Sequence, residues 1–273
     1  HCGLVGSEMC IRDSPNGEKW TKAPFDFSQL KQIFNHWQTG LNGKGWGALF
    51  WCNHDQPRVV SRLGDDKNYR VESAKMLGSS VHMMQGTPYI YQGEEIGMTN
   101  PGYTSIEQYC DVESTNMYDI MVNQQGVSNE DMIDILAQKS RDNSRTPMQW
   151  NDEQYAGFSQ AQPWLAVAEN YPQVNAAKAV DDSDSVFYFY QKLIQLRKEI
   201  EVITTGDYQD LYPNHDQIFG YQRKSAKQTL ICLNNYYGVE AQCALPESFK
   251  VDCAKYVFCL LYTSDAADEV SCG

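Results

Sequence analysis

Apolar residues recur every three or four positions in three segments of the chain, residues 25–40, 69–85 and 185–200. This spacing gathers them on one face of a helix, so it predicts three amphipathic helices that each bury an apolar stripe. A fourth, shorter helix is predicted over residues 129–139. In the first segment the stripe consists of Phe27, Leu30, Ile33, Phe34 and Trp37.

Two short apolar runs lie among these helices and predict strands, the first of them a buried parallel strand. The first, ALFWC, leads into His54 and Asp55, and the second, TPYIYQ, leads into Glu94 and Glu95. Helices that alternate with parallel strands are typical of a (β/α) barrel, where functional side chains follow the C-terminal ends of the strands. We therefore expect these polar residues at the functional end of a barrel.

The pattern changes after Val202, where the short runs IFGYQR, QTLICLNNY and AQCALP alternate with turn residues. This texture predicts a small antiparallel β domain over residues 203–258, after an α/β barrel part over residues 15–202. Residues 95–126 are too many for an ordinary connection and contain Gly, Pro and Asn. We expect them to form a substrate-facing excursion with little regular structure.

The two ends of the chain lack the periodicity of their neighbours. Residues 1–14, HCGLVGSEMCIRDS, and residues 259–273, CLLYTSDAADEVSCG, resemble translated read-through of sequencing adapters. We expect both to be non-native segments that contribute nothing to the fold. Native but disordered termini are the alternative.

The formal net charge of −13 over 273 residues gives the protein a field that repels nucleic acid and anionic membranes. We expect neither as a partner, and a phosphate-bearing substrate would need a local basic pocket. Nine cysteines without a CxxC pair or a grouping with histidine argue against a disulfide framework and against a metal site. Such thiols, with no long apolar run and no visible leader, indicate a cytoplasmic protein.

His54 and Asp55 are the first candidates for chemistry. A buried carboxylate at a strand end, oriented by a neighbouring histidine, can stabilise positive charge on a sugar carbon while it accepts hydrogen bonds from hydroxyls. A lone His-Asp dipeptide is more often a helix cap or a structural pair. The neighbouring sequence segments are therefore needed to distinguish the catalytic role from the structural one.

Three segments together resemble one known family. FWCNHDQPR, from Phe50, resembles the fourth signature segment of the α-amylase superfamily, glycoside hydrolase family 13. GTPYIYQGEEIGMTN and SRDNSRTPMQW resemble the last barrel strand and a loop of its oligo-1,6-glucosidase branch. The resemblance runs from Pro15 to about Lys250. It implies the C-terminal part of a (β/α)8 TIM barrel followed by the antiparallel β domain.

The resemblance implies a retaining α-glucosidase that uses no cofactor and no metal. It assigns transition-state stabilisation to Asp55 and contacts with the cleaved sugar to His54 and Arg141, and it gives Arg145 a structural role. It also implies that the nucleophile and the general acid lie on earlier strands, upstream of this chain, so that the chain alone is expected to have little activity.

KSRDNSRTPMQW, DVES-x-NMY and ITTGDYQDLYP resemble the members of the branch that act on a phosphorylated disaccharide. The implied reaction is hydrolysis of trehalose 6-phosphate to glucose and glucose 6-phosphate. Lys19, one of few basic residues near the predicted cleft entrance, is a candidate ligand of the phosphate. A solvated surface lysine fits the sequence equally well.

Two positions need separate treatment. Gly17-Glu18-Lys19-Trp20 spells the Gly-Glu-x-Trp pattern in which amylases place their general acid. It does not end an apolar strand, so a structural or substrate-edge role is favoured for Glu18. Before DVES the family usually has Arg and this sequence has Cys110, which predicts the loss of a loop salt bridge.

Three other functions fit the same pattern. An oligo-1,6-glucosidase or isomaltase would use the same machinery without a phosphate pocket, and a transglycosylating isomerase belongs to the same branch. A transporter heavy chain would use the amylase fold without catalysis, but the intact NHDQPR and RDN segments favour an enzyme. We expect Trp46, Trp51, Trp150 and Trp164 in the core, although Trp150, beside the loop that carries Arg141, fits a sugar-stacking platform as well.

Overall fold

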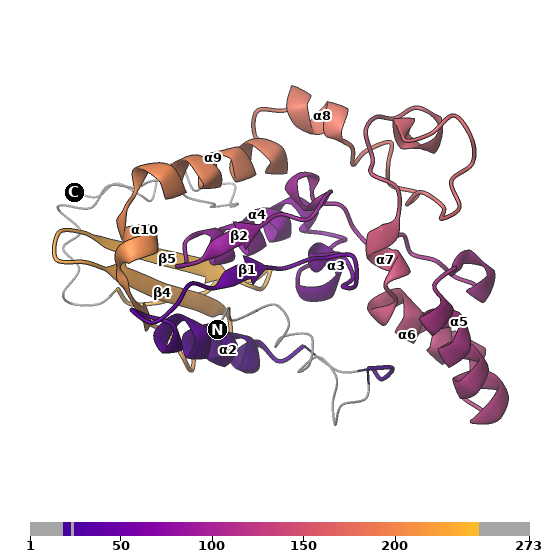
Figure 1. Ribbon diagram of the computed structural model, residues 1–273, viewed down its shortest axis with the longest axis horizontal. Coiled ribbons are helices and arrows are strands. Elements are labelled where there is room, and N and C mark those ends of the chain that lie inside the picture. The colour runs from indigo at the N-terminus through magenta and orange to yellow at the C-terminus, as the bar shows by residue number, and fades with distance from the viewer. Residues whose placement is uncertain (1–18, 23–24, 246–273) are drawn as a thin grey trace.

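The computed structural model of the chain describes residues 19–22 and 25–245 (Figure 1). The predictions for residues 1–14 and 259–273 lie outside the described residues. Those for Glu18 and for residues 246–258 of the β domain lie outside them too.

The four predicted helices are present. The three that were predicted to be amphipathic are α2 (Phe27–Gly40), α4 (Arg70–His82) and α9 (Val186–Glu199), and the shorter one is α6 (Asn129–Lys139). The prediction of a single buried stripe was wrong for α4, which is buried on all sides from Ser73 to His82. The side chain of Asp26 accepts a hydrogen bond from a backbone N–H in the first turn of α2. Such a cap satisfies one of the free donors at a helix start, so the chain fixes the beginning of α2 locally.

The two apolar runs form short parallel strands, β1 (Ala48–Phe50) and β2 (Thr87–Tyr89), which pair with each other. The chain crosses from β1 to β2 through α3 (Val59–Leu63) and α4. A parallel pair joined by a helical crossover is the repeating unit of a (β/α) barrel. The turns that follow both strands therefore leave from the same edge of the sheet.

The region after Val202 contains an antiparallel sheet, as predicted. After the short helix α10 (Val202–Thr205) come β3 (Asp207–Asp210), β4 (Ile218–Lys224) and β5 (Thr229–Asn235), which pair in the order β3-β4-β5. No strand forms over residues 241–245, the described part of the AQCALP run.

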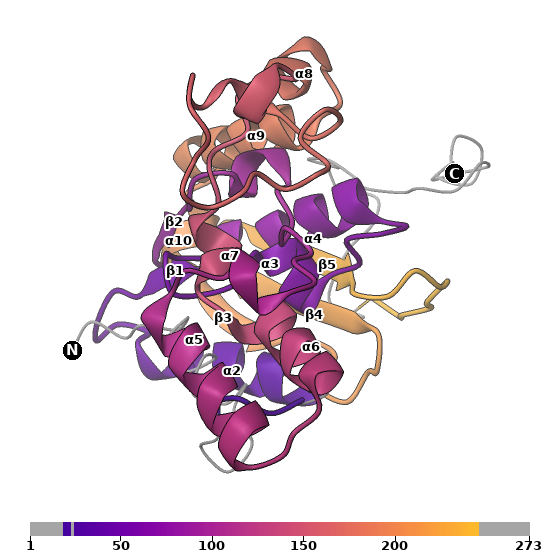
Figure 2. The same ribbon diagram turned by 90° about the vertical axis from the view of Figure 1, so that its right-hand side faces the viewer.

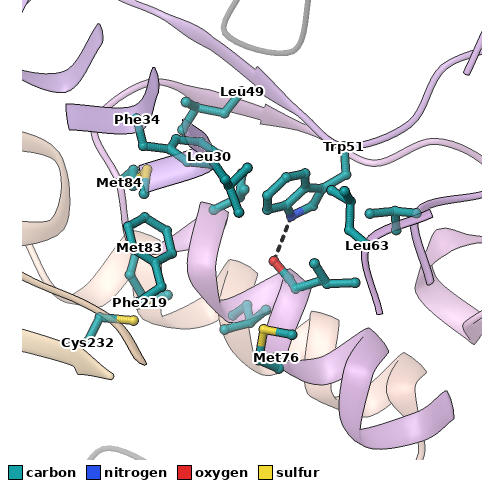
Figure 3. Packing of buried hydrophobic residues seen from close by; sticks show 14 of the residues in the cluster. Leu30, Phe34, Leu49, Trp51, Leu63, Met76, Met83, Met84, Phe219 and Cys232 are labelled. Carbon is teal, nitrogen blue, oxygen red and sulfur yellow. Dashed lines mark hydrogen bonds between the residues drawn. The ribbon is translucent and has the colours of Figure 1, made fainter. Parts of the chain in front are cut away.

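One apolar core joins this sheet to the barrel helices (Figure 3). Phe34 of α2 stacks on Phe219 of β4 with ring centroids 5.5 Å apart, and Trp51 meets Phe34 edge-on. The indole N–H of Trp51 donates to the carbonyl oxygen of Leu77 at 2.7 Å, so this buried polar group is satisfied. Because the core crosses the predicted boundary near residue 203, the sheet packs on the barrel helices.

The excursion after β2 is more regular than predicted. It begins with the 3-10 turns η2 (Glu94–Ile96) and η3 (Ile106–Gln108), and continues with α5 (Val112–Tyr118) and the π-helical turn η4 (Asp119–Gln124). Expecting little regular structure was therefore wrong for residues 112–124. Apolar side chains of this stretch pack with the buried face of α6, beside which α5 lies (Figures 1 and 2).

The segment between α6 and α9 contains only short elements, α7 (Asp142–Arg145), η5 (Gln154–Gly157) and α8 (Ala176–Asp181). Of the four tryptophans considered for the core, only Trp51 is buried in it. The predictions for Trp46 and Trp164 were wrong because both are exposed, and Trp150, for which the core was one of two alternatives, is exposed too. None of the helices within residues 19–22 and 25–245 combines the length and apolar character that a membrane span requires.

Candidate active site

The turn after β1 presents His54 and Asp55. The side-chain oxygen of Asn53 accepts a hydrogen bond from the backbone N–H of Asp55 at 2.8 Å, which closes a local turn. Just beyond it, the buried Arg58 donates to the carbonyl oxygen of Gln92 at 2.5 Å. The turn after β1 is thereby tied to the turn after β2.

Asp55 faces two arginines that lie far away in the sequence. Its Oδ1 lies 2.7 Å from Nη2 of Arg145 and 3.8 Å from Nη1 of Arg141, while its Oδ2 lies 3.3 Å from Nε2 of His54. We expected a buried carboxylate, but 44% of the Asp55 side chain is exposed. The carboxylate is therefore paired with cations and still open to a ligand.

Arg145 contacts Asp55 directly, although the resemblance implied only a structural role for it. Its Nε also donates to the backbone carbonyl of His54 at 2.8 Å, so one guanidinium holds both residues of the dipeptide. The signal that could have found it is spacing: Arg141 and Arg145 lie four residues apart, one helical turn, and such residues share a face.

Asp111 is the residue of the site that sequence reasoning missed. Its Oδ1 lies 2.7 Å from Nη2 of Arg141 and 3.3 Å from Nη1 of Arg145, and its Oδ2 accepts from Nε of Arg141 at 3.2 Å. Burial by itself would raise the pKa of Asp111. The hydrogen bond and charge of Arg141 outweigh that effect, so the pKa lies below its ordinary value and the group is an anion at neutral pH.

The two segments that carry Asp111 and Arg141 are joined independently of this ion pair. The fully buried carboxylate of Asp142 accepts the backbone N–H groups of Cys110 and Asp111 at 2.7 and 2.8 Å. The loop is therefore held through its backbone at the position where a salt bridge was expected to be missing, and the Cys110 side chain is exposed.

Lys19 reaches the same cluster through a second residue that we did not single out, Glu113. The Lys19 ammonium lies 2.9 Å from Oε2 of Glu113, and that oxygen lies 3.3 Å from Nε of Arg141. The structure thus brings the sequence-derived residues Lys19, His54, Asp55 and Arg141 into one chain of contacts. The charge of Lys19 is already engaged by Glu113.

The acids after β2 behave differently. Glu94 is buried and accepts a hydrogen bond from the hydroxyl of Tyr190 on α9 at 2.9 Å. Burial raises the pKa of Glu94 to about 7 and also raises the pKa of Glu95. Glu94 therefore packs against α9 and takes no part in the cluster around Asp55.

The cluster around Asp55 consists of three carboxylates and three cations that contact one another. A carboxylate accepts hydrogen bonds from sugar hydroxyls, and a guanidinium group donates hydrogen bonds to them. A carboxylate also stabilises positive charge in its vicinity. Within the described residues, no group of three or more His, Cys, Asp or Glu side chains could hold a metal ion. The members of the cluster are Lys19, Asp55, Asp111, Glu113, Arg141 and Arg145.

Comparison with known proteins agrees with these features. The α-amylase catalytic domain family matches residues 7–206. The chain is 54% identical to the trehalose-6-phosphate hydrolase of Bacillus subtilis over 258 residues, which is 94% of this chain and 46% of that protein. It is 50% identical to an oligo-1,6-glucosidase of Halalkalibacterium halodurans, with 84% of this chain and 40% of that protein covered.

Among solved structures, the trehalose-6-phosphate hydrolase of Bacillus licheniformis matches with a TM-score of 0.86 and 53% identity. The match covers 89% of this chain and 44% of that one, so the chain spans about half the length of these relatives. The predicted fold, part of a TIM barrel followed by a small β domain, is confirmed. The chain belongs to the α-amylase family.

Proposed function

We propose that the protein is a retaining α-glucosidase that hydrolyses trehalose 6-phosphate to glucose and glucose 6-phosphate. The observation that carries the proposal is the meeting of His54 and Asp55 with Arg141 and Arg145 in one charged cluster. The chain around this cluster is 54% identical to a trehalose-6-phosphate hydrolase, which supports the substrate.

The cluster suits the demands of glycoside cleavage. Positive charge develops on the sugar ring in the transition state, and a carboxylate close to it lowers the barrier. In the proposal Asp55 supplies that carboxylate, while His54 and Arg141 bind hydroxyls of the sugar that is cleaved. Retention also takes a nucleophile and a general acid, and the proposal gives neither role to residues 19–22 or 25–245.

Lys19 is the proposed ligand of the 6-phosphate. In the structure its ammonium pairs with Glu113, and the guanidinium of Arg141 lies beyond the same carboxylate. A phosphate dianion that replaced Glu113 as the partner of Lys19 would gain a charge-assisted hydrogen bond. The affinity for phosphate would then depend on how much more strongly Lys19 binds phosphate than it binds the Glu113 carboxylate. A comparison of phosphorylated and unphosphorylated substrates tests this difference.

The test measures glucose release from trehalose 6-phosphate, trehalose and isomaltose by the full-length gene product. We expect the phosphorylated substrate to have the highest kcat/KM. Lys19→Met should raise KM for trehalose 6-phosphate alone, by about tenfold, if one charge-assisted contact is lost. Lys22→Met is the matched control, because Lys22 lies on the same segment and pairs with Asp131 and Asp134. Equal effects of Lys19→Met on all three substrates would contradict the phosphate role.

An oligo-1,6-glucosidase is the second candidate. It is favoured by the existing pair of Lys19 with Glu113, which already engages the charge of Lys19, and by the 50% identity to the Halalkalibacterium halodurans enzyme. A preference for isomaltose, together with a Lys19→Met variant that is unaffected, would select this function.

We further propose a cytoplasmic location and a small sugar phosphate as the ligand, with no nucleic-acid or membrane partner. The net charge of −13 and nine cysteines without disulfide-like spacing support this proposal. Cell fractionation with an antibody against the protein tests the location.

A further inference from the structure

We propose that Asp111 is a positioning residue for the proposed reaction: it fixes the two arginines that contact Asp55, and through them the orientation of Asp55. This inference rests on the proposed function, since Asp55 is the group whose placement it concerns. The oxygens of Asp111 contact the guanidinium groups of Arg141 and Arg145, so Asp111 acts on Asp55 through these arginines.

The first support is geometric. Both oxygens of Asp111 accept from Arg141, Oδ1 from Nη2 at 2.7 Å and Oδ2 from Nε at 3.2 Å. A two-point contact between a carboxylate and a guanidinium fixes the angle between the planes as well as the distance. Arg141 therefore has one orientation, from which its Nη1 faces Asp55 at 3.8 Å.

The second support is that Arg145 bridges the two carboxylates. Its Nη1 lies 3.3 Å from Oδ1 of Asp111 and its Nη2 lies 2.7 Å from Oδ1 of Asp55. A guanidinium is planar and rigid, so movement of the Nη1 end moves the Nη2 end with it. Without Asp111, Arg145 would be held by Asp55 and by the backbone carbonyl of His54, both on the turn after β1, so the guanidinium could move together with that turn.

The third support is the difference in burial. The side chain of Asp111 is 4% exposed, whereas that of Asp55 is 44% exposed. Ion pairs in contact with water are weak and mobile, and buried ones constrain their members more strongly. The buried carboxylate therefore anchors the arginines, and the exposed one is oriented by them.

Charge gives a reason why turnover should depend on this anchor. Without the Asp111 anion, Arg141 and Arg145 would lose their buried partner, and part of their positive charge would stay uncompensated beside Asp55. Positive charge there opposes the positive charge of the transition state, so the expected loss lies in kcat. Ground-state contacts to sugar hydroxyls would change less, so KM should stay close to its original value.

The backbone around Asp111 allows a clean substitution. Asp111 is the N-cap of α5 and its Oδ2 accepts from the N–H of Ser114, a role that asparagine fills as well as aspartate. The loop is also held by Asp142 and by a hydrogen bond of 2.7 Å between the hydroxyls of Ser114 and Ser140. Asp111→Asn should therefore keep the fold while it removes the charge.

The experiment compares Asp111→Asn with Asp119→Asn in the full-length gene product. Asp119 lies directly after α5 and undergoes the same chemical change, but it is exposed, and its carboxylate accepts from the side chains of Asn123 and Gln124 instead of from the two arginines. We expect Asp111→Asn to lower kcat by about 10- to 100-fold with KM changed less than about threefold, the range for residues that orient a functional group. Asp119→Asn should leave kcat within about threefold.

Three results would overturn the inference. They are a kcat of Asp111→Asn within about threefold of the unmodified protein, a loss carried by KM, or a crystal structure of the variant in which Arg145 and Asp55 keep their separation of 2.7 Å. If the unmodified protein cleaves none of the three substrates, the proposed function is refuted. The crystal structure of the variant still tests the positioning role of Asp111 in that case, because it needs no activity. If Asp111→Asn fails to fold, Asp111→Ser keeps a capping oxygen without the charge and takes its place.

Discussion

The turns after β1 and β2 both follow a parallel strand and both carry acidic residues, yet they serve different purposes. After β1, Asp55 is half-exposed and contacts Arg141 and Arg145. After β2, Glu94 is buried and bonded to the hydroxyl of Tyr190. Two neighbouring strands therefore end in one carboxylate that a ligand can reach and one that is part of the packing.

The difference comes from what later segments bring to each turn. The loop at residues 140–145 brings two guanidinium groups to Asp55 and leaves it in contact with water. Helix α9 instead covers Glu94, and its desolvation raises the pKa to about 7 because Tyr190 and the charge of Arg58 offset only part of the cost. An acid at a strand end thus becomes a candidate for catalysis only once its partners are known.

Replacing the exposed acid should have the largest effect. We expect Asp55→Asn in the full-length gene product to lower kcat by about 10²- to 10³-fold, the usual cost of removing one electrostatic stabiliser of a transition state. The melting temperature should change little, because the side chain is half-exposed. Steady-state kinetics and calorimetry on the same preparation measure both quantities.

Glu94→Gln is the matched control, since it makes the same chemical change at the end of the neighbouring strand. Its kcat at pH 7 should stay within about threefold of the unmodified protein. If Asp55→Asn kept a near-normal kcat, or if Glu94→Gln lost as much, the contrast between the two turns would be wrong.

Arg141→Ala should have the next largest effect. The variant removes a proposed sugar contact and the two-point partner of Asp111, so kcat/KM should fall by about 10- to 100-fold. Stability should fall less, because Asp142 holds the loop through backbone hydrogen bonds. A lower melting temperature with unchanged kcat/KM would reassign Arg141 to a structural role.

Glu94 should make the free energy of unfolding depend on pH. Its pKa is about 7 in the folded protein and close to 4.5 when unfolded, so between these values only the folded state holds the proton. The free energy of unfolding should therefore fall as pH rises from about 4.5 to about 7. Glu94→Gln, which can still accept from Tyr190, should remove this fall and be more stable than the unmodified protein at pH 8, by about 1 to 2 kcal/mol.

Denaturant titrations at pH 5, 6.5 and 8 measure this difference. His82 has the opposite dependence, because burial lowers its pKa to about 4 and stability then falls as pH drops below about 6.5. His82 is present in both proteins, so its contribution cancels in the comparison. Parallel pH profiles for the two proteins would show that Glu94 does not hold its proton in the folded state.

The elements that could be predicted from the sequence are those with a clear apolar stripe. Helices α2, α4 and α9 and the strand β1 bury side chains that are visible as apolar positions in the sequence. The strand β2 was found as an apolar run, although Thr87 and Tyr89 are exposed. The helix at residues 112–118 could not be predicted in this way, because it has no buried apolar stripe: its buried residue is Ser114, and Met117 and Tyr118 are only partly buried. The exposure of three tryptophans was not predicted for a related reason. The sequence does not show which surfaces are covered by another part of the chain.

The residues of the site also fall into two groups, those that the sequence indicates and those that only the structure shows. Asp55, His54, Arg141 and Lys19 were found because they lie in or beside recognisable segments, and the structure brings them together. Their roles stay predictions. Asp111 was missed because its importance depends on distances to residues about 30 positions away, which only the folded chain reveals.

The smallest effect is expected at Cys110. This residue adjoins Asp111, so its replacement tests whether kcat also depends on the side chain next to the cluster around Asp55. The backbone N–H of Cys110 donates to Asp142 at 2.7 Å, whereas its exposed side chain has only a weak contact, 3.5 Å from its sulfur to the carbonyl oxygen of Trp164. Cys110→Ser keeps the backbone contact, so kcat should change by less than about twofold and the free energy of unfolding by less than about 0.5 kcal/mol. Cys110→Pro is the contrasting variant, because proline removes that N–H and should lower both kcat and stability. A fivefold loss in Cys110→Ser would mean that the side chain, and not the backbone hydrogen bond, holds the loop that carries Asp111.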